Sequence, residues 1–304
     1  MNQNTRGAFI AIVGKPNVGK SSIMNRILGQ KVAIVSDKPQ TTRNRIMGVL
    51  TRDETQLVFI DTPGLHKPRN VLGKSMVKAI EDSVGDVDAA MLVVAASEFR
   101  GSPSKADISL IEKFKKQHIP ALLVINKIDL LNDKEKLLSV TAAYTSLFDF
   151  SAVVYSSARD GYGCDTLVEE LTKFAQEGPH FFDDDMLTDQ TERSLAAEII
   201  REKLLRSLDK EVPHGIAVVI EKFKDRQTSS GEDIVDIDAV IYCESESHKG
   251  IVIGKGGSML KKVSSYARHD METFFECKVN LSCWVKVKED WRNRQSLIHN
   301  FELD

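Results

Sequence analysis

The sequence predicts an α/β protein whose first domain has a mostly parallel sheet and whose second, smaller domain is α+β. Short apolar runs alternate with amphipathic stretches from Ala8 to Ala175, an acidic stretch with Gly and Pro then interrupts this rhythm, and a different order of elements follows. A chain of 304 residues is long enough for two domains. We therefore expect a first domain over residues 1–178, a linker over 179–190 and a second domain over 191–304.

The expected strands of the first domain are continuous apolar runs, as in strands that are covered on both faces. They are AFIAIVG (8–14), TQLVFID (55–61), DAAMLVVAA (88–96), PALLVINK (120–127) and SAVVYSS (151–157). Helical patterns lie between these runs, and the alternation is typical of a parallel sheet with helices on both faces.

The second region follows EGPHFFDDDMLTDQ (177–190), which we interpret as the linker. Asp189 followed by Glu192 has the spacing of a capping box and predicts the start of a helix there. Two strand-like runs come next, then two helical segments on either side of residues 254–257, and last a strand over 278–288. The predicted order of the second domain is therefore α-β-β-α-α-β.

Composition argues against several classes of protein. The net charge of −3 gives no overall signal for nucleic-acid binding, so any basic surface must be local. The four cysteines form no C-x-x-C pair, which favours reduced thiols in a cytosolic protein and argues against zinc. The N-terminal residues lack a signal-peptide pattern, and no apolar stretch approaches the roughly 20 residues that span a bilayer.

The motif GKPNVGKS, Gly14 to Ser21, matches the phosphate loop G-x-x-x-x-G-K-[ST] and lies between an expected strand and an expected helix. Backbone N–H groups of such a loop and of the following helix N-terminus bind phosphate oxygens. Lys20 supplies positive charge to the terminal phosphates, and Ser21 offers a hydroxyl to Mg²⁺. The alternative is a chance glycine-rich turn, but three further motifs occur in order and argue against it.

Each of these three motifs lies at the end of an expected strand. In DTPG (61–64), Asp61 can hold Mg²⁺ through water and the Gly64 N–H can sense a γ-phosphate. In NKID (126–129), the Asp129 carboxylate can accept hydrogen bonds from the N1–H and exocyclic amine of guanine, which selects GTP over ATP. Asn126 would shape the base pocket with Lys127 packed along it. In SSA (156–158) the Ala158 backbone can reach the guanine O6.

Together these motifs resemble those of the small GTPase family, over residues 8–175. The resemblance implies that PQTTRN (39–44) lies in the first switch region and that Thr42 is the second Mg²⁺ ligand, with Thr41 as its rival. The predicted nucleotide contacts are Gly14, Lys15, Pro16, Asn17, Val18, Gly19, Lys20, Ser21, Asp61, Thr62, Pro63, Gly64, Asn126, Lys127, Asp129, Ser157 and Ala158. The predicted Mg²⁺ ligands are Ser21, Thr42 and Asp61, and the ligands of the site are GTP or GDP with Mg²⁺.

One departure from Ras-type enzymes concerns the water that attacks GTP. Leu65 follows DTPG where a water-orienting glutamine is expected, and a leucine cannot position water. In similar GTPases an asparagine at the position of Asn17 helps to hold K⁺, so Asn17 is a candidate K⁺ ligand. The alternative is that Asn17 only fixes the turn through bonds to the backbone.

A second glycine loop, GKGG (254–257), joins two expected helical segments. Residues 248–294 contain ten Lys and Arg against five Asp and Glu, a local positive balance in a negative chain. A G-x-x-G loop between two helices resembles a KH domain, and the α-β-β-α-α-β order resembles its type II form; such loops clamp the backbone of about four single-stranded nucleotides. The resemblance implies RNA contacts at Ile253, Gly254, Lys255, Gly256, Gly257, Lys261 and Lys262.

The alternative reading of GKGG is a glycine-rich helix end with solvated lysines. Ile251, Val252 and Ile253 are expected to form a wall of the RNA groove or its core backing. Trp284 and Trp291 are expected to pack in the core and at the domain edge rather than to stack on bases.

A phosphate-loop GTPase domain with PQTTR, followed by a C-terminal type II KH domain with HKGIVIGKGGSMLKK, resembles the Era family of bacterial ribosome-assembly GTPases, from Ala8 to Arg294. The resemblance implies binding to the 3′ end of 16S rRNA, a role in maturing the 30S subunit, and a monomeric, cytoplasmic protein with peripheral association to the inner membrane.

The hypothesis is a switch: GTP and Mg²⁺ order the loops around Thr42 and Gly64, hydrolysis releases them, and residues 177–190 act as the hinge. Two other classes stay open. One is a membrane-associated GTPase regulator of the cell cycle that uses the KH region for protein docking. The other is a constitutive RNA-binding factor whose nucleotide site only adds stability.

Overall fold

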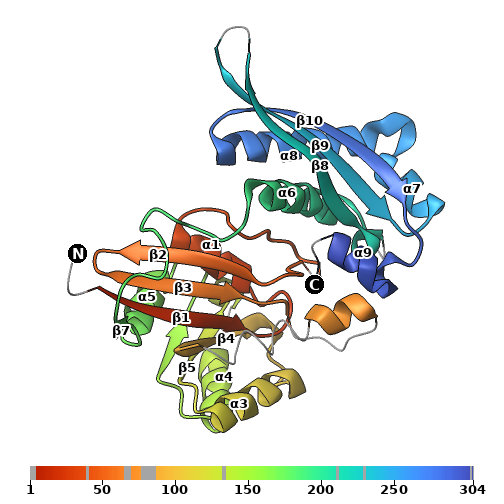
Figure 1. Cartoon of the computed structure of the whole chain (residues 1–304). Helices are drawn as coiled ribbons and strands as arrows, with labels where there is room; N and C mark the ends of the chain where they lie inside the picture. Colours follow the sequence, from red (N-terminus) through yellow and green to blue (C-terminus); the bar gives the residue numbers. More distant parts are fainter. Residues whose placement is uncertain are drawn as a thin grey trace. The chain divides into compact units, whose positions relative to one another are not determined.

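The computed structural model describes residues 5–38, 41–64, 70–76, 87–131, 135–209, 212–228, 231–301 and 303 (Figure 1). Contacts divide the chain into two compact units. The first unit comprises Met1–Ala33, Thr42–Pro68 and Gly73–Asp189, and the second comprises Ile34–Thr41, Arg69–Leu72 and Gln190–Asp304. Two short segments from the N-terminal part of the sequence therefore group with the C-terminal unit.

The first unit is built on a mostly parallel sheet, as predicted. Its strands are β1 (Arg6–Val13), β2 (Ile46–Arg52), β3 (Thr55–Asp61), β4 (Ala89–Ala95), β5 (Ala121–Asn126) and β6 (Ala152–Tyr155), in the order β2-β3-β1-β4-β5-β6. All neighbours are parallel except β2, which pairs antiparallel with β3, and the short β7 (Gln176–Glu177) pairs antiparallel with β1. The sequence predictions did not include β2 and β7.

Helices cover both faces of this sheet (Figure 1). The elements are α1 (Lys20–Leu28), α3 (Lys105–Gln117), α4 (Glu135–Thr145) and α5 (Cys164–Thr172). Successive residues of β1 point to opposite faces: Ile10 and Ile12 join the core formed with α1 and α5, whereas Ala11 and Val13 join the core formed with α3 and α4. This arrangement places the carboxyl ends of the parallel strands at one edge, where the predicted motifs follow.

The predicted linker makes hydrogen bonds to the first unit. The Val49 N–H donates to the Leu187 carbonyl at 2.9 Å, and Thr188 bridges to Gly48 on β2. The Asp189 carboxylate accepts from the Met47 N–H at 3.1 Å, so the prediction that Asp189 caps the next helix was wrong. Thr191 is the N-cap instead, and its hydroxyl accepts from the Ser194 N–H.

The second unit has the predicted α-β-β-α-α-β order. Its elements are α6 (Glu192–Ser207), β8 (Ala217–Gln227), β9 (Asp233–Cys243), α7 (Glu246–Ile253), α8 (Ser258–Phe275) and β10 (Lys278–Val287), with a further helix α9 (Gln295–Asn300). The sheet order is β10-β9-β8, with β8 antiparallel and β10 parallel to β9. Apolar residues of α6 and α8 pack with Ile237, Ala239 and Ile241 of β9 in one core.

Short 3₁₀ helices complete the described structure: η1 (Ala96–Glu98), η2 (Ile128–Leu130), η3 (Val212–Gly215), η4 (Lys255–Gly257) and η5 (Trp291–Asn293). Among the helices of the described ranges, none combines the length and the apolar character needed to cross a membrane.

Candidate functional site

The phosphate loop Gly14–Ser21 follows β1 and leads into α1, as predicted. Gly14 and Gly19 have φ of 146° and 102°, which favour glycine. A Cβ at Gly14 would lie 2.3 Å from the Val93 carbonyl oxygen, and one at Gly19 would lie 2.2 Å from Asn126 Nδ2. The loop is therefore packed tightly against its own protein. No side chain caps the N-terminus of α1 within the described residues, so its first N–H groups are available to an anion.

Lys20 is buried at the start of α1, and its ammonium lies over the phosphate loop. Nζ donates to the carbonyl oxygens of Lys15 at 3.1 Å and Gly14 at 3.3 Å. Burial lowers the pKa of Lys20, while the nearby Asp61 carboxylate opposes this shift. A buried cation that carbonyl groups hold in place is suited to bind phosphate oxygens.

Three oxygen-bearing side chains meet beside Lys20. The Ser21 hydroxyl donates to Asp61 Oδ2 at 2.5 Å and lies 3.0 Å from Thr42 Oγ1, and the Thr42 hydroxyl lies 3.5 Å from the same Asp61 oxygen. Asp61 Oδ1 is buried without a hydrogen-bond partner in the described residues. Burial raises the pKa of Asp61, and Lys20 and the two hydroxyls oppose this rise. Hard oxygen ligands of this kind fit Mg²⁺.

The two candidate switch threonines differ in their surroundings. The Thr41 hydroxyl donates to the Lys38 carbonyl at 2.7 Å and to Ser36 Oγ at 3.2 Å, whereas Thr42 lies with Ser21 and Asp61. The geometry therefore favours Thr42 over Thr41 as a metal ligand. The neighbouring Pro39 and Gln40 of the predicted switch motif lie outside the described residues.

The DTPG segment lies close to the phosphate loop. The Thr62 hydroxyl donates to the Ile12 carbonyl at 2.9 Å, and a Cβ at Gly64 would lie 2.5 Å from Pro16 Cα. Only a glycine at position 64 allows this close approach of two backbones. Leu65, the residue that replaces the expected glutamine, lies outside the described residues.

The predicted base-binding residues also lie near one another. Asn126 Nδ2 donates to the Val18 carbonyl at 2.8 Å, and its Oδ1 accepts from the Ala158 N–H at 3.2 Å. The Ser157 hydroxyl donates to Asp129 Oδ1 at 3.0 Å. Asn126 thus connects the phosphate loop to the SSA segment, and Ser157 orients the Asp129 carboxylate. Lys127 pairs with Glu98 at 3.4 Å.

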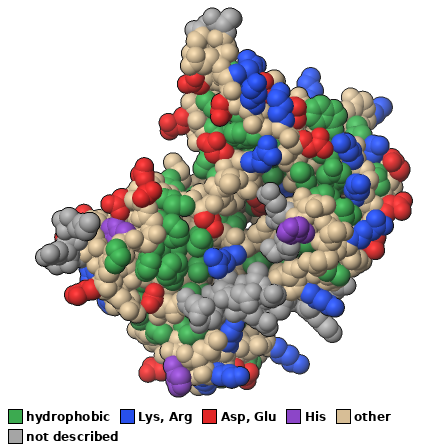
Figure 2. Space-filling view, in the orientation of Figure 1, with side chains coloured by type: hydrophobic (Ala, Val, Ile, Leu, Met, Phe, Trp, Pro, Cys, Tyr) green, Lys and Arg blue, Asp and Glu red, His purple; other side chains and the backbone are tan. Residues whose placement is uncertain are grey.

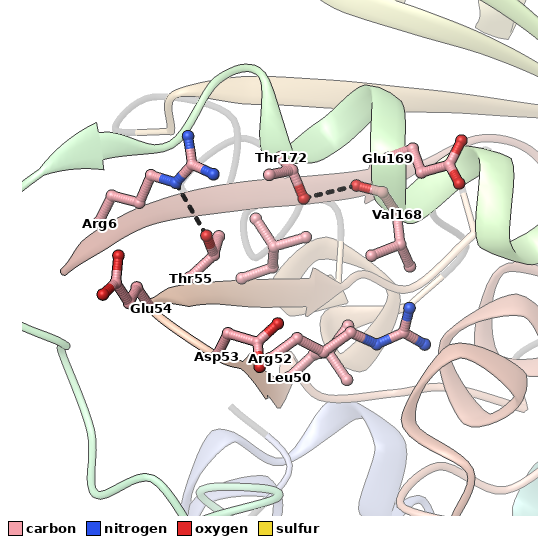
Figure 3. A pocket seen from close by; sticks show the side chains of 10 residues that line it. Arg6, Leu50, Arg52, Asp53, Glu54, Thr55, Val168, Glu169 and Thr172 are labelled. Atoms are coloured by element: carbon pink, nitrogen blue, oxygen red, sulfur yellow. Dashed lines mark hydrogen bonds between the residues drawn. The ribbon is translucent and has the colours of Figure 1, made fainter. Parts of the chain in front are cut away.

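A cavity of about 540 Å³ lies at the edge of the first sheet where β1 and β3 begin, away from the carboxyl ends of the strands (Figure 3). Arg6 and Thr55, the first residues of β1 and β3, line it together with Arg52, and Arg6 Nε donates to Thr55 Oγ1 at 2.9 Å. Ligands of open α/β sheets bind at the carboxyl ends of the strands, so this cavity does not compete with the phosphate loop as a nucleotide site.

Sequence reasoning missed a set of buried charges on α6. Arg201, Glu202 and Lys203 are consecutive and all buried. Arg201 Nη2 donates to the Thr41 carbonyl, and Glu202 Oε1 accepts from the Val35 N–H at 3.1 Å. Val35 and Thr41, which precede Thr42 in the sequence, are thus held by α6. Charged residues in a helix are usually solvated, so no sequence signal indicated this contact.

The GKGG loop joins α7 to α8, as predicted. Gly254, Gly256 and Gly257 have φ of 73°, 60° and 79°. A Cβ at Gly256 or Gly257 would meet no described atom within 4 Å, so the loop presents its backbone to open space. Positively charged side chains surround the loop: Lys255, Lys261 and Lys262 are all exposed.

The apolar residues before this loop have different environments. Val252 is fully buried, Ile253 is partly buried and Ile251 is half exposed. Val252 therefore backs the core, and Ile251 and Ile253 are accessible beside the loop. Trp291 is fully buried, and its Nε1–H donates to the Gly215 carbonyl at 2.9 Å. Trp284 is 47% exposed, so the prediction that it packs in the core was wrong.

Comparisons with known proteins match both units. A family model described as 50S ribosome-binding GTPase matches residues 9–127, and a KH-domain model matches residues 211–292. GTPase Era of Clostridioides difficile (strain 630) is 49% identical over 296 residues, which is 97% of this chain and 98% of that protein. GTPase Era of Ruminiclostridium cellulolyticum is 46% identical over 293 residues, 96% of each chain.

Two solved structures resemble the whole chain. A variant of Aquifex aeolicus Era bound to GDP·AlF₄⁻ has a TM-score of 0.92 and 37% identity, and the match covers 98% of this chain and 99% of that one. A structure of Era in complex with MgGDPNP and nucleotides 1506–1542 of 16S ribosomal RNA has a TM-score of 0.91 and 37% identity, with 98% of each chain covered.

Proposed function

This chain belongs to the Era family of GTPases, and from that premise we propose that it is a GTP-driven switch that binds the 3′ end of 16S rRNA and assists assembly of the 30S subunit. The observation that carries the proposal is the presence of two glycine loops in one chain, a tightly packed phosphate loop and an open GKGG loop. An Era of similar structure is bound to a GTP analogue and to the 3′ part of 16S rRNA.

The first loop binds and orients the triphosphate of GTP. Backbone N–H groups of Gly14–Ser21 and the buried Lys20 ammonium face the phosphate oxygens, and Asp129 pairs with the N1–H and exocyclic amine of guanine. Ser21, Thr42 and Asp61 would hold Mg²⁺, which supplies positive charge to the phosphates when bound. Asp61 Oδ1 is buried and has no hydrogen-bond partner among the residues that the structure describes, which supports this assignment.

The residue after DTPG is Leu65, so no glutamine at this position orients the water that attacks GTP. We assign Asn17 as a ligand of K⁺, which would supply positive charge near the phosphates. The positive φ of 62° at Asn17 is compatible with this role and equally with a turn-forming one. GTP hydrolysis is therefore compared in KCl and NaCl at equal ionic strength. Faster turnover in KCl supports the assignment, and equal rates contradict it.

Nucleotide state and RNA binding are coupled through the first switch. Thr42 lies with Ser21 and Asp61, while the preceding residue, Thr41, accepts a hydrogen bond from Arg201 of α6. A change at Thr42 on hydrolysis is therefore passed to the segment that α6 holds. RNA should bind the GTP form more tightly, and by linkage RNA should raise GTP affinity by the same factor. Equal RNA affinity in the two nucleotide states would contradict the coupling.

The remaining assignments rest on family membership. We place the catalytic part in residues 1–178, the hinge in 179–190 and the RNA-binding part in 191–304, and we expect a monomer that associates peripherally with the inner membrane. Protein docking by the KH region is the competing role. The relatives favour RNA, since an Era with both units holds it.

The test compares RNA sequences. Fluorescence anisotropy would measure the binding of an oligonucleotide from the 3′ end of 16S rRNA and of a scrambled oligonucleotide with the same composition, both in the presence of a GTP analogue. We expect clear preference for the 16S sequence. Equal affinity would leave a nonspecific RNA-binding GTPase, and no binding of either RNA would favour protein docking.

A further inference from the structure

The exposed Trp284 lies on the face of the second sheet that α6 and α8 do not cover. Along β10, Val279, Leu281, Cys283 and Val285 belong to the core with these helices. Trp284 is even-numbered, whereas these core residues are odd-numbered, and successive residues of a strand point to opposite faces. The Trp284 side chain therefore points to the other face of the sheet. It is 47% exposed, and its indole N–H has no hydrogen-bond partner among the described residues. A large aromatic ring is thus presented to solvent on a strand.

Cations outnumber carboxylates on this outer face. The register places Lys278 and Lys286 of β10 on the same side as Trp284, and Lys222, Lys224 and Arg226 of β8 lie across β9 from them. The acidic groups on this face are Asp236, Asp238 and Glu221. Figure 2 shows Lys and Arg side chains gathered along the β8–β9 hairpin.

Ion pairs use only part of this positive charge. Arg226 and Lys222 pair with Asp236 at 2.9 and 3.7 Å, and Lys286 pairs with Glu221 at 3.3 Å. Lys224 and Lys278 make no ion pair within the described residues. Two exposed ammonium groups and one carboxylate, that of Asp238, therefore remain outside ion pairs in the described part of the chain. The remaining balance is positive and favours an anionic ligand.

The strand β10 connects this face to the GKGG loop. It is an edge strand, since the sheet order is β10-β9-β8, and it contacts α7 and α8, the helices that the loop joins. A polymer that leaves the loop and crosses the free edge of β10 reaches Trp284 within the same unit. Lys278 and the β10 partner position of Lys224, Asn280, both precede Trp284 along β10, so the two cations lie on one side of the ring. An aromatic ring next to cations that bind phosphates is an arrangement on which proteins stack unpaired bases.

We propose that the outer face of the KH sheet is a second contact for single-stranded RNA, in which Trp284 stacks on a base and Lys278 and Lys224 contact the phosphates. This proposal rests on the RNA-binding function proposed above and extends the RNA path beyond the GKGG loop. The RNA strand binds first at the loop and continues over the edge of β10 onto Trp284.

Length dependence of RNA binding separates the two contacts. A KH groove holds about four nucleotides, so an oligonucleotide of four nucleotides occupies the loop alone, whereas one of about twelve also reaches the outer face. Trp284→Ala should weaken binding of the longer RNA about fivefold to a hundredfold, as loss of base stacking does, and leave the shorter RNA unaffected. Trp284→Phe, which keeps an aromatic ring, should retain most of the affinity.

Leu138 provides a control, because it is 69% exposed on α4 of the first unit and lies outside the assigned site and hinge residues. Leu138→Ala should bind both RNAs like the wild type. Gly256→Asp tests the loop itself. If Gly256→Asp abolishes RNA binding but Trp284→Ala does not change it, the proposed RNA function stands and the outer face is not an RNA contact. If neither substitution changes RNA affinity, the RNA-binding function itself is wrong.

Fluorescence reports the same contact directly. The chain has two tryptophans, of which Trp291 is buried, so a stacked base should quench Trp284 selectively. The longer RNA should quench the emission of the wild type, and Trp284→Phe should bind the RNA without this quenching. Equal quenching in the wild type and in Trp284→Phe would overturn the proposal, because the signal would then come from Trp291.

Discussion

The two glycine loops of this chain use the same residue for different reasons. Gly14 and Gly19 of the phosphate loop have no room for a Cβ, since the Val93 carbonyl and the Asn126 amide lie about 2 Å from where it would be. Gly256 and Gly257 of the second loop have positive φ, and a Cβ at either would meet no atom of the described ranges within 4 Å. Neighbouring residues of the same unit pack against the first loop, whereas the backbone of the second loop is accessible to a partner.

This difference indicates what each loop binds. A loop enclosed by neighbouring strands fits a small ligand of fixed size, such as a nucleotide. An open loop beside exposed lysines fits a polymer that passes along its surface. A substitution in one loop should therefore change the affinity for its own ligand, and should leave the affinity for the other ligand unchanged when that ligand is measured alone.

Asp129→Asn should have the largest effect. Loss of the carboxylate removes the acceptor for guanine N1–H and the exocyclic amine, so preference should shift from GTP to xanthosine triphosphate by about a thousandfold or more. Competition binding with the two nucleotides measures the shift. Asp160→Asn is the matched control, because Asp129 and Asp160 each place a carboxylate oxygen 3.0 Å from Ser157 Oγ. A similar shift in both variants would contradict the assignment of Asp129.

Lys20→Ala should weaken GTP binding by about a hundredfold or more, because it removes the buried cation that faces the phosphates. RNA binding measured without nucleotide should stay at the wild-type level, since the GKGG loop lies in the other unit. Calorimetric titration with GTP and anisotropy with RNA provide the two values. Loss of both would show that the loops are not independent.

Features that depend on residues close together in the sequence could be predicted. The spacing of GKPNVGKS, DTPG and NKID predicted the strand ends that carry the nucleotide site, and Gly254–Gly257 between helical patterns predicted the second loop. The missed features depend on packing between distant residues. Gly48 within β2 weakens its strand pattern although the residue packs against Leu28 and Met24.

Two other features were missed for different reasons. Charged residues in a helix are usually solvated, and only the fold shows that Arg201, Glu202 and Lys203 have partners such as Thr41, Val35 and Asp270. The burial of these charges could not be inferred from the sequence. Residues 278–287, in contrast, alternate apolar odd-numbered positions with mostly polar even-numbered ones, and this alternation already indicates that Trp284 lies on the polar face.

Gly256→Asp should weaken RNA binding by about tenfold or more through repulsion of phosphate, without changing GTP affinity. Gly256→Asn is the matched control, since both side chains tolerate the positive φ of 60° but only aspartate is charged. Anisotropy with RNA from the 3′ end of 16S rRNA measures both variants. An equal loss in the two variants would point to backbone strain instead of phosphate contact.

Asp236→Asn should give the smallest effect, on the stability of the second unit. Hydrogen bonds from Arg226 and Asn280 lower the pKa of Asp236 to about 2, below its unfolded value of about 3.9. Its contribution is therefore complete above about pH 4 and disappears as pH falls through about 2. Urea unfolding monitored by tryptophan emission should show the variant less stable than the wild type at pH 7 and the difference vanishing towards pH 2. A difference that persists at pH 2 would contradict this pKa.

Crosslinking tests the separation of the two loops most directly. The full chain, loaded with a GTP analogue, is irradiated with photoreactive RNA from the 3′ end of 16S rRNA, and the crosslinked peptides are identified by mass spectrometry. We expect crosslinks within Ile253–Lys262 and none within Gly14–Ser21. Crosslinks confined to the phosphate loop, or spread equally over both loops, would contradict it.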